Sequence, residues 1–407
     1  MAGPLKHIRV LDLSRVLAGP WASQILADLG AEVIKIEKPG EGDDTRGWGP
    51  PFIANPDGSR GDAAYFLSTN RGKSSVLIDM SKPDGQKLIR ELAAKSDVVL
   101  ENFKVGGLKK YGLDYESLRA VNPGLIYCSI TGFGQHGPYA QRAGYDFMIQ
   151  GMGGIMSVTG QPDGEPGAEP MKVGVAFADI FTGLYAVIGM LAALSHRERT
   201  GEGQQVDLAL LDCQVAVLAN QALNFLVGGQ VPTRLGNAHP NIVPYQTFKT
   251  RDGHIIIAVG TDRQFREFCR IAGIAHIADD PRFSTNRGRV ENRKELVSLL
   301  IDPIKTRSTG EWIALLEAAA VPCGPINRID EVFADPQVIA RGIQITLSRP
   351  DGAVTPGVAN PIRLSATPID YDRAPPALGD GTATVLKTVL GLAEGDVEAL
   401  RDSGVIG

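Results

Sequence analysis

The chain has 407 residues, of which 43% are hydrophobic and 21% charged, with a formal net charge of -5 at pH 7. This length exceeds what one ordinary hydrophobic core requires, so two domains are expected. The near balance of charges argues against a general nucleic-acid surface and against an anionic membrane partner, so any anion site must be local.

The N-terminal residues show no export signal. Residues 1–7 lack the basic and apolar halves of a secretion signal, and no apolar run is expected to reach the roughly 20 residues of a membrane span. We therefore expect a cytoplasmic protein without a membrane partner, with a removed organelle transit peptide as the alternative.

The sulfur and imidazole side chains are scattered along the chain. The four cysteines form no CxxC pair, and the six histidines form no HExxH motif. These spacings predict reduced, mostly buried thiols and no bound metal.

Over the first two hundred residues, strand-like stretches alternate with amphipathic helices. Strands are predicted at residues 8–14, 32–38, 75–79, 98–102 and 125–131, and helices at residues 21–29 and 85–95. This alternation is typical of βαβ units around a parallel sheet. We predict a doubly wound α/β domain.

A long helix is predicted at residues 175–199, where basic residues followed by Gly201 mark its C-terminus. Because it is apolar on most sides, we expect it to be buried. Around residues 228–241 the composition turns to Gly, Pro, Asn and Arg, which indicates a passage into a second domain.

The second domain is predicted to be smaller, with an α+β fold. A strand is expected at residues 255–259, and helices at residues 264–272, 293–305 and 310–320. We place the large domain at residues 1–224, the small domain at 225–330, and at 331–407 a segment of short strands and two helices that returns to the large domain.

Nucleotide-binding fingerprints are incomplete, because Leu67 and Met156 occupy positions that need glycine. A GxSxG hydrolase motif is also absent. Basic residues instead gather near the predicted strand ends. Lys35 and Lys38 lie at the second strand, Arg71 and Lys73 before the third, and Lys104, Lys109 and Lys110 after the fourth. The carboxyl ends of parallel strands meet at one crevice, where several cations suit a ligand with multiple phosphates. The alternative is that they are solvated surface residues.

One carboxylate, Asp179, stands in an apolar stretch at the predicted start of the long helix. It can be a helix-capping group that stays ionised, or a nucleophile whose partly desolvated charge is more reactive. The loop at residues 142–146, taken alone, is a loop with a stabilising Tyr145.

Several short motifs occur in a fixed order: VLDLSRVLAGP at 10–20, DLGAEVIKIE at 28–37, NRGK at 70–73, ENF at 101–103, GYD at 144–146, GVAFADIFTG at 174–183, TGEGQ at 200–204 and VPCGP at 321–325. Together they resemble the family III CoA-transferases, which include formyl-CoA, carnitine and dicarboxylate CoA-transferases. The α-methylacyl-CoA racemases are cousins of this group. The resemblance covers essentially the whole chain.

This resemblance implies that Asp179 is the nucleophile of a transfer through an acyl-aspartyl anhydride and an aspartyl-CoA thioester. A carboxylate that is ionised at neutral pH can attack a thioester without a separate base. Contacts to CoA are implied for Val16, Ala18, Lys38, Lys73, Asn102, Phe103, Lys110 and Tyr145. No prosthetic group is expected, because the CoA thioester is itself a substrate.

The resemblance also implies an interlocked homodimer, with each active site between the large domain of one subunit and the small domain of the other. Such threading is an exception to the rule against linked topologies. It is not visible in the sequence pattern.

Substrate choice is suggested by two departures from the formyl-CoA transferases. Leu17 stands where they have glutamine, and their run of glycines in the small domain is absent, so a small polar acceptor such as oxalate is disfavoured. Residues 234–246 are instead similar to transferases that use succinyl-CoA with C4 to C6 dicarboxylates such as glutarate. Candidates for binding the distal carboxylate are Arg15, Arg46, His239 and Tyr245, among which an arginine can pair in a bidentate manner.

Two other functions are considered. A racemase would need a general base in the Gly-Tyr-Asp turn, and the phenol of Tyr145, with a reference pKa of about 10, is a poor base at neutral pH. A CoA-binding or dinucleotide-binding protein without catalysis would keep the lysines but have no use for Asp179.

Overall fold

The computed structural model describes residues 3–407, which form two compact units. The first unit combines the chain up to Ile155 with Lys172–Leu223 and Gln337–Gly407, and the second combines Met156–Met171 with Asn224–Pro336. The predicted boundaries differ in two ways, since residues 156–171 join the second unit and the return to the first begins at residue 337.

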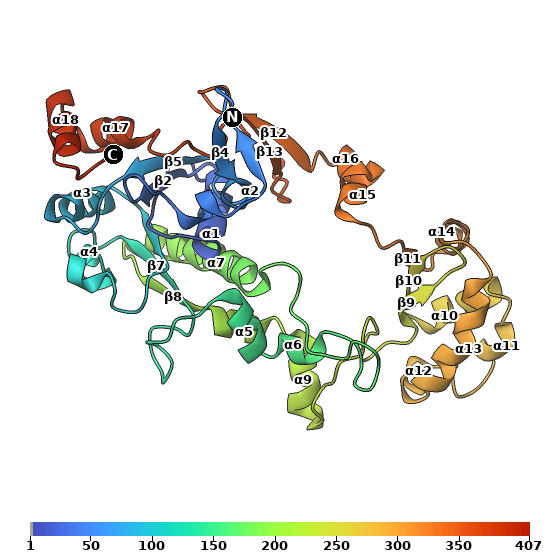
Figure 1. Cartoon of the computed structure of the whole chain (residues 1–407). Helices are drawn as coiled ribbons and strands as arrows, with labels where there is room; N and C mark the ends of the chain where they lie inside the picture. Colours follow the sequence, from blue (N-terminus) through green and yellow to red (C-terminus); the bar gives the residue numbers. More distant parts are fainter. Residues whose placement is uncertain (1–2) are drawn as a thin grey trace. The chain divides into compact units, whose positions relative to one another are not determined.

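A six-stranded parallel sheet lies at the centre of the first unit (Figure 1). Its strands, in spatial order, are β5 (Lys73–Leu77), β2 (Glu32–Glu37), β1 (Arg9–Asp12), β6 (Val98–Glu101), β7 (Ile126–Thr131) and β8 (Gln205–Ala209). The chain runs outward from β1 to one edge and then from β6 to the other. The predicted parallel sheet is confirmed, and its topological switch point lies between β1 and β6.

Helices cover both faces of this sheet. Because successive residues of a strand point to opposite faces, Val10 joins one hydrophobic core and Leu11 joins the other. Residues of α1 (Ala18–Asp28) and α7 (Phe177–Thr200) fill the first core, and those of α3 (Pro83–Ala94) fill the second. Burial on both faces explains the nearly continuous hydrophobic strands.

Shorter elements complete the first unit. They are η1 (Asp44–Gly47), β3 (Phe52–Ala54), β4 (Arg60–Ala63), α2 (Ala64–Leu67), η2 (Lys109–Tyr111), α4 (Tyr115–Arg119), α5 (Asp146–Met152), α8 (Leu210–Ala216), β12 (Gln344–Ser348), β13 (Val354–Val358), α17 (Thr382–Val385), η3 (Leu386–Leu390) and α18 (Glu394–Asp402). The last five form the short strands and terminal helices expected for the C-terminal segment.

The helix α7 lies within two residues of its predicted bounds, but it is less buried than predicted. By length and composition it could cross a membrane, so the expectation that no segment is long enough was wrong. It packs against α1, β7 and β8, as a core helix does, and buries Ala186 and Met190. Its other side carries exposed Tyr185 and Ile188, so only part of the helix is buried within this chain.

The second unit contains a three-stranded antiparallel sheet, with β10 (His254–Ala258) between β9 (Tyr245–Lys249) and β11 (Cys323–Gly324). Its helices are α10 (Asp262–Ile271), α11 (Ala275–Ala278), α12 (Asn286–Glu291), α13 (Arg293–Lys305), α14 (Thr309–Ala318) and α15 (Ile329–Ala334). The strand and the three helices predicted here are all present. Helices α6 (Ile155–Val158), α9 (Ala219–Gly228) and α16 (Pro336–Ala340) span the divisions between units.

A buried ion pair ties the C-terminal segment of the first unit to its N-terminal part. The guanidinium of Arg71 lies 2.7 Å from the carboxylate of Asp28, and both side chains are nearly inaccessible. Arg71 also donates to the main-chain oxygen of Val358 at 2.8 Å, and Asn360 donates to Asp28 at 3.0 Å. The returning segment therefore depends on a charge pair formed by residues far away in the sequence.

We predict that Arg71→Ala lowers the free energy of unfolding by about 3 kcal/mol, because it leaves the Asp28 carboxylate buried without a cation. Chemical unfolding followed by circular dichroism measures this loss. The control is Arg287→Ala, which removes an exposed pair with Glu291 and is expected to cost less than about 1 kcal/mol. Equal losses for the two variants would contradict the prediction.

Candidate active site

A pocket of about 690 Å³ opens beside the carboxyl ends of β1, β6 and β7, where the strand order of the sheet reverses. All its lining residues belong to the first unit. They come mainly from the loops at residues 15–18, 102–111 and 130–145, and Asp179 of α7 joins them. This is the sheet edge at which the sequence predicts an anion site.

Most of the predicted CoA contacts line this pocket. They are Val16, Ala18, Asn102, Phe103, Lys110 and Tyr145. Arg15, predicted to bind a substrate carboxylate, lies there too, and so does Asp179. The structure thus brings residues from four separate segments of the chain together around one carboxylate.

Lys73, the first residue of β5, is not among the residues that line this pocket. Its fully buried ammonium group is 3.2 Å from the Asp12 carboxylate and donates to Asn70 Oδ1 at 2.9 Å and to the Pro20 oxygen at 3.0 Å. Burial lowers the pKa of Lys73 to about 8. The structure therefore gives no support to the predicted contact between Lys73 and a phosphate, because protein groups already surround its side chain.

Lys38 lies beside the main pocket rather than in it. It lines a second pocket of about 390 Å³, which shares Arg15, Met80 and Phe103 with the first. Its exposed ammonium group pairs with Glu41 at 2.6 Å. This pair is open to solvent, so a stronger anion can displace it.

Arg46 is also bound by protein groups. Its guanidinium pairs with Glu37 at 2.7 Å and with Asp62 at 2.9 Å, and it lies 3.7 Å from the centre of the Phe66 ring. Because these buried partners occupy the cation, the structure gives no support to its predicted role in binding a substrate carboxylate.

His239 and Tyr245 belong to the second unit and are not among the residues that form this pocket. Their ring centres lie 5.2 Å apart, and His239 Nδ1 accepts a hydrogen bond from the main chain of Asn241. Partial burial and the nearby Arg293 lower the pKa of His239. Their predicted role in substrate binding stays a prediction.

Asp179 lies in the first turn of α7, but a different carboxylate caps the helix. Asp146, the first residue of α5, accepts a hydrogen bond from the main-chain N–H of Ala178 at 2.8 Å and a longer one from that of Asp179 at 3.4 Å. The residue before the helix, Ala176, provides no side-chain cap. Asp179 is thus free of the capping role that was its alternative explanation.

The environment of Asp179 disfavours its charge. Burial raises its pKa from the ordinary 3.8 to about 7, and the like charge of Asp146 adds to this rise. The expectation of full ionisation at neutral pH is therefore corrected, since protonated and ionised forms coexist near pH 7. When ionised, such a poorly solvated carboxylate is a more reactive nucleophile.

Tyr65 is a neighbour of this carboxylate that sequence reasoning missed. Burial raises the pKa of its phenol to about 12, and the charges of Asp179 and Asp146 contribute. The ring packs edge-on against Trp48, with centres 5.3 Å apart. Nothing in the local sequence distinguishes this tyrosine from a core residue.

Two further cations line the pocket, and features of the sequence pointed to both of them. Lys104 is one of the basic residues after β6, and Arg142 opens the loop that contains Tyr145. The guanidinium of Arg142 stacks over the rings of Phe133 at 5.2 Å and Tyr139 at 4.5 Å. The pocket thus combines cations, aromatic rings and one carboxylate with a raised pKa, and the cations suit an anionic ligand.

Comparisons with known proteins agree with this chemistry. Residues 5–382 match CoA-transferase family III. The chain is 57% identical to a succinate–glutarate CoA-transferase of Agrobacterium fabrum, over 94% of this chain and 95% of that one. It is 44% identical to a human succinyl-CoA:glutarate CoA-transferase, over 99% of this chain and 90% of that one.

A solved structure has the same fold. The crystal structure of a CAIB/BAIF family protein from Brucella suis covers 96% of this chain with a TM-score of 0.84 and 54% sequence identity, and all of that chain is matched.

We predict that Asp179→Asn stabilises the protein at pH 8 but not at pH 4. A carboxyl group whose pKa is higher in the folded state stabilises the fold at low pH, and this contribution is lost as the pH rises through about 7. The asparagine variant avoids burying a charge, so the difference in melting temperature between the variant and the wild type should grow between pH 4 and pH 8. A difference that does not change with pH would contradict the raised pKa.

Proposed function

This chain belongs to CoA-transferase family III, and from that premise we propose that it moves CoA from succinyl-CoA to a dicarboxylate such as glutarate, with Asp179 as the covalently reacting residue. The main support for this role of Asp179 is that it lines the pocket and that burial raises its pKa to about 7. A buried carboxylate without a cation has little structural value.

The reaction follows from the chemistry of a carboxylate beside a thioester. The ionised Asp179 attacks the thioester carbonyl, the C–S bond breaks, and CoA thiolate leaves behind an acyl-aspartyl anhydride. The thiolate then attacks the carbonyl carbon of Asp179, so that the first acid departs as a carboxylate and an aspartyl-CoA thioester remains. The acceptor carboxylate reverses both steps. One carboxylate enters and one leaves, so no net proton transfer is needed.

The cations of the pocket support the binding of CoA. Arg15, Lys104, Lys110 and Arg142 line the same cavity as Asp179 and can pair with phosphate oxygens. Phe103 and Tyr145 offer apolar ring surfaces for the pantetheine or the adenine.

The choice of acceptor is supported by the relatives and by one residue of the pocket. The two similar proteins named above are, by their names, glutarate CoA-transferases. Arg15 lines the pocket, and its guanidinium pairs with the exposed Asp44 at 3.2 Å, so a substrate carboxylate can compete for it. We retain His239 and Tyr245 of the second unit as candidates for the same role.

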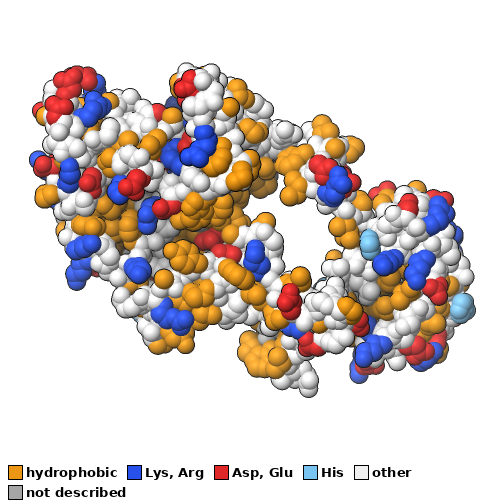
Figure 2. All heavy atoms as spheres, in the orientation of Figure 1, with side chains coloured by type: hydrophobic (Ala, Val, Ile, Leu, Met, Phe, Trp, Pro, Cys, Tyr) orange, Lys and Arg blue, Asp and Glu red, His pale blue; other side chains and the backbone are white. Residues whose placement is uncertain are grey.

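We also propose an interlocked homodimer in the cytoplasm. The resemblance implies the interlock, and the location is the one expected from the sequence. Exposed apolar side chains support association, since α7 exposes Tyr185 and Ile188, and α9 exposes Phe225 and Leu226. Figure 2 shows a cluster of hydrophobic side chains over α9. Patches of this kind mark interaction sites on soluble proteins.

We predict that Asp179→Ala reduces transfer by more than about 1000-fold, because the attacking group is lost. Wild-type protein incubated with succinyl-CoA and quenched should carry added mass on the peptide that contains residue 179, and the variant should not. Asp146→Asn is the control, since it keeps an acceptor oxygen for the cap and leaves the nucleophile in place, and it should still form the adduct. Transfer that survives the loss of Asp179 would refute the proposed function.

We predict that glutarate is a better acceptor than formate or oxalate. A distal carboxylate gives a cation such as Arg15 a partner that formate does not have. A panel of carboxylates incubated with succinyl-CoA, followed by mass spectrometry of the CoA products, ranks the acceptors. If formate or oxalate exceeds every larger diacid, the assigned acceptor class is wrong.

A further inference from the structure

The loop after β1 brings an uncommon backbone conformation into the pocket. Val16 has a φ of +70°, in the left-handed region that a β-branched residue adopts only with strain. Val16, Leu17 and Ala18 all line the pocket that contains Asp179. The strained residue is therefore part of the reaction site.

Side chains of Asp12, Lys35 and Asn102 hold the main chain just before this residue. The Ser14 N–H donates to Asp12 at 2.9 Å, and the Ser14 oxygen accepts from the ammonium group of Lys35 at 2.8 Å. The side-chain amide of Asn102 binds both the N–H and the oxygen of Arg15, at 2.9 and 2.7 Å. The loop cannot rotate without breaking several hydrogen bonds.

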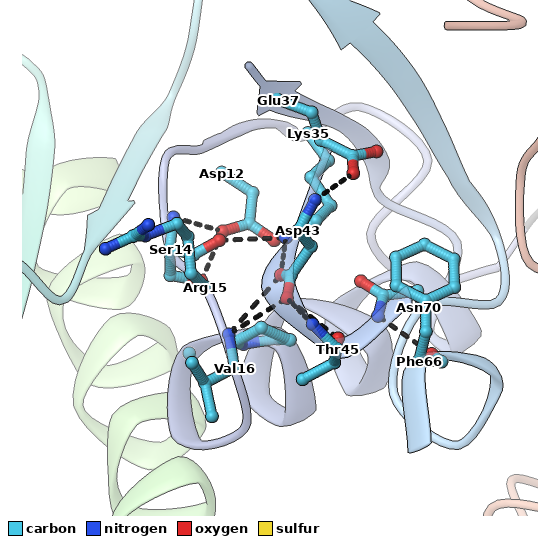
Figure 3. Close-up of polar contacts among 12 residues, drawn as sticks. Asp12, Ser14, Arg15, Val16, Lys35, Glu37, Asp43, Thr45, Phe66 and Asn70 are labelled. Atoms are coloured by element: carbon cyan, nitrogen blue, oxygen red, sulfur yellow. Dashed lines mark hydrogen bonds and ion pairs between the residues drawn. The ribbon is translucent and has the colours of Figure 1, made fainter. Parts of the chain in front are cut away.

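Asp43 holds Val16 itself. Its two carboxylate oxygens accept the Val16 N–H at 3.3 and 3.4 Å, and Lys35 approaches the same carboxylate from another side at 2.9 Å (Figure 3). The side chains of Asp43 and Lys35 are both fully buried. Burial alone would raise the pKa of Asp43, but Lys35 and the hydrogen bonds from Thr45 lower it to about 2. The acceptor therefore stays ionised throughout the working range of pH.

We propose that Asp43, fixed by Lys35, is a positioning residue for CoA transfer that keeps Val16 in its left-handed conformation. This inference rests on the proposed function. Helix α1 begins directly after this loop, at Ala18, and the first N–H groups of a helix have no partner within it. Fixing Val16 therefore fixes where main-chain donors lie when negative charge develops on the reacting carbonyl oxygen.

The competing explanation is that Asp43 only stabilises the fold, and a double-mutant cycle separates the two. Glycine adopts a positive φ freely, so Val16→Gly removes the strain that Asp43 has to hold. We expect Asp43→Asn to lower kcat by about 10- to 100-fold, with a KM for succinyl-CoA within about twofold, because a misplaced reacting group affects the chemical step most. In the Val16→Gly background the same substitution should cost less than about threefold.

A second variant addresses the case in which Asp43→Asn fails to fold. The exchange Asp43→Leu with Lys35→Met removes both buried charges together and replaces them with apolar groups of similar volume, which is often tolerated. This protein should keep its melting temperature within a few degrees but show the same loss of kcat. The matched control is Asp57→Asn, since Asp57 makes the same kind of local bonds to Ser59 in an exposed turn, and its kcat should not change.

Two results would overturn the inference. One is a folded Asp43 variant with kcat within twofold of the wild type, and the other is an equal loss with valine or glycine at position 16. Either result leaves the dependence of transfer on Asp179 intact. Failure of the proposed function would instead appear as transfer that persists in Asp179→Ala.

Discussion

Buried ion pairs near the carboxyl end of β1 hold the loop that enters the pocket. Asp12, the last residue of β1, pairs with Lys73 of β5, and Lys35 of β2 pairs with Asp43. Burying a charge is costly unless its partner is in place, so each pair permits only a narrow range of arrangements. The loop after β1 is bound to these groups and enters the pocket in a fixed conformation.

The cost of burying a charge also explains why two aspartates of the first unit differ in pKa. Asp43 faces a buried lysine, and its pKa is about 2. Burial raises the pKa of Asp179 to about 7, and the like charge of Asp146 adds to this rise. Burial acts on both aspartates, and their neighbours decide whether the pKa ends below or above its ordinary value. Of the two, Asp179 is the carboxylate whose ionised form is less favoured.

The sequence by itself determined the parallel sheet, all of its strands except β8, and the residue types of the site. Strand and helix periods are local, so β1, β2, β6 and β7 were predicted close to their bounds. Cations such as Lys104 and Lys110 were recognisable because they follow a strand end, and Asp179 because it interrupts an apolar stretch. Each of these signals depends on neighbours within a few residues.

Only the tertiary structure decided which of these side chains are free to bind a ligand and which are already bound by other parts of the protein. Lys73 and Lys110 both looked like phosphate ligands, yet Lys73 is enclosed by Asp12 and Asn70, whereas Lys110 lines the pocket. Asp146 caps a helix that begins 31 residues later in the chain, and this removes the capping explanation for Asp179. Pairing partners of this kind are set by long-range packing, because a charge is neutralised by whatever the fold brings next to it.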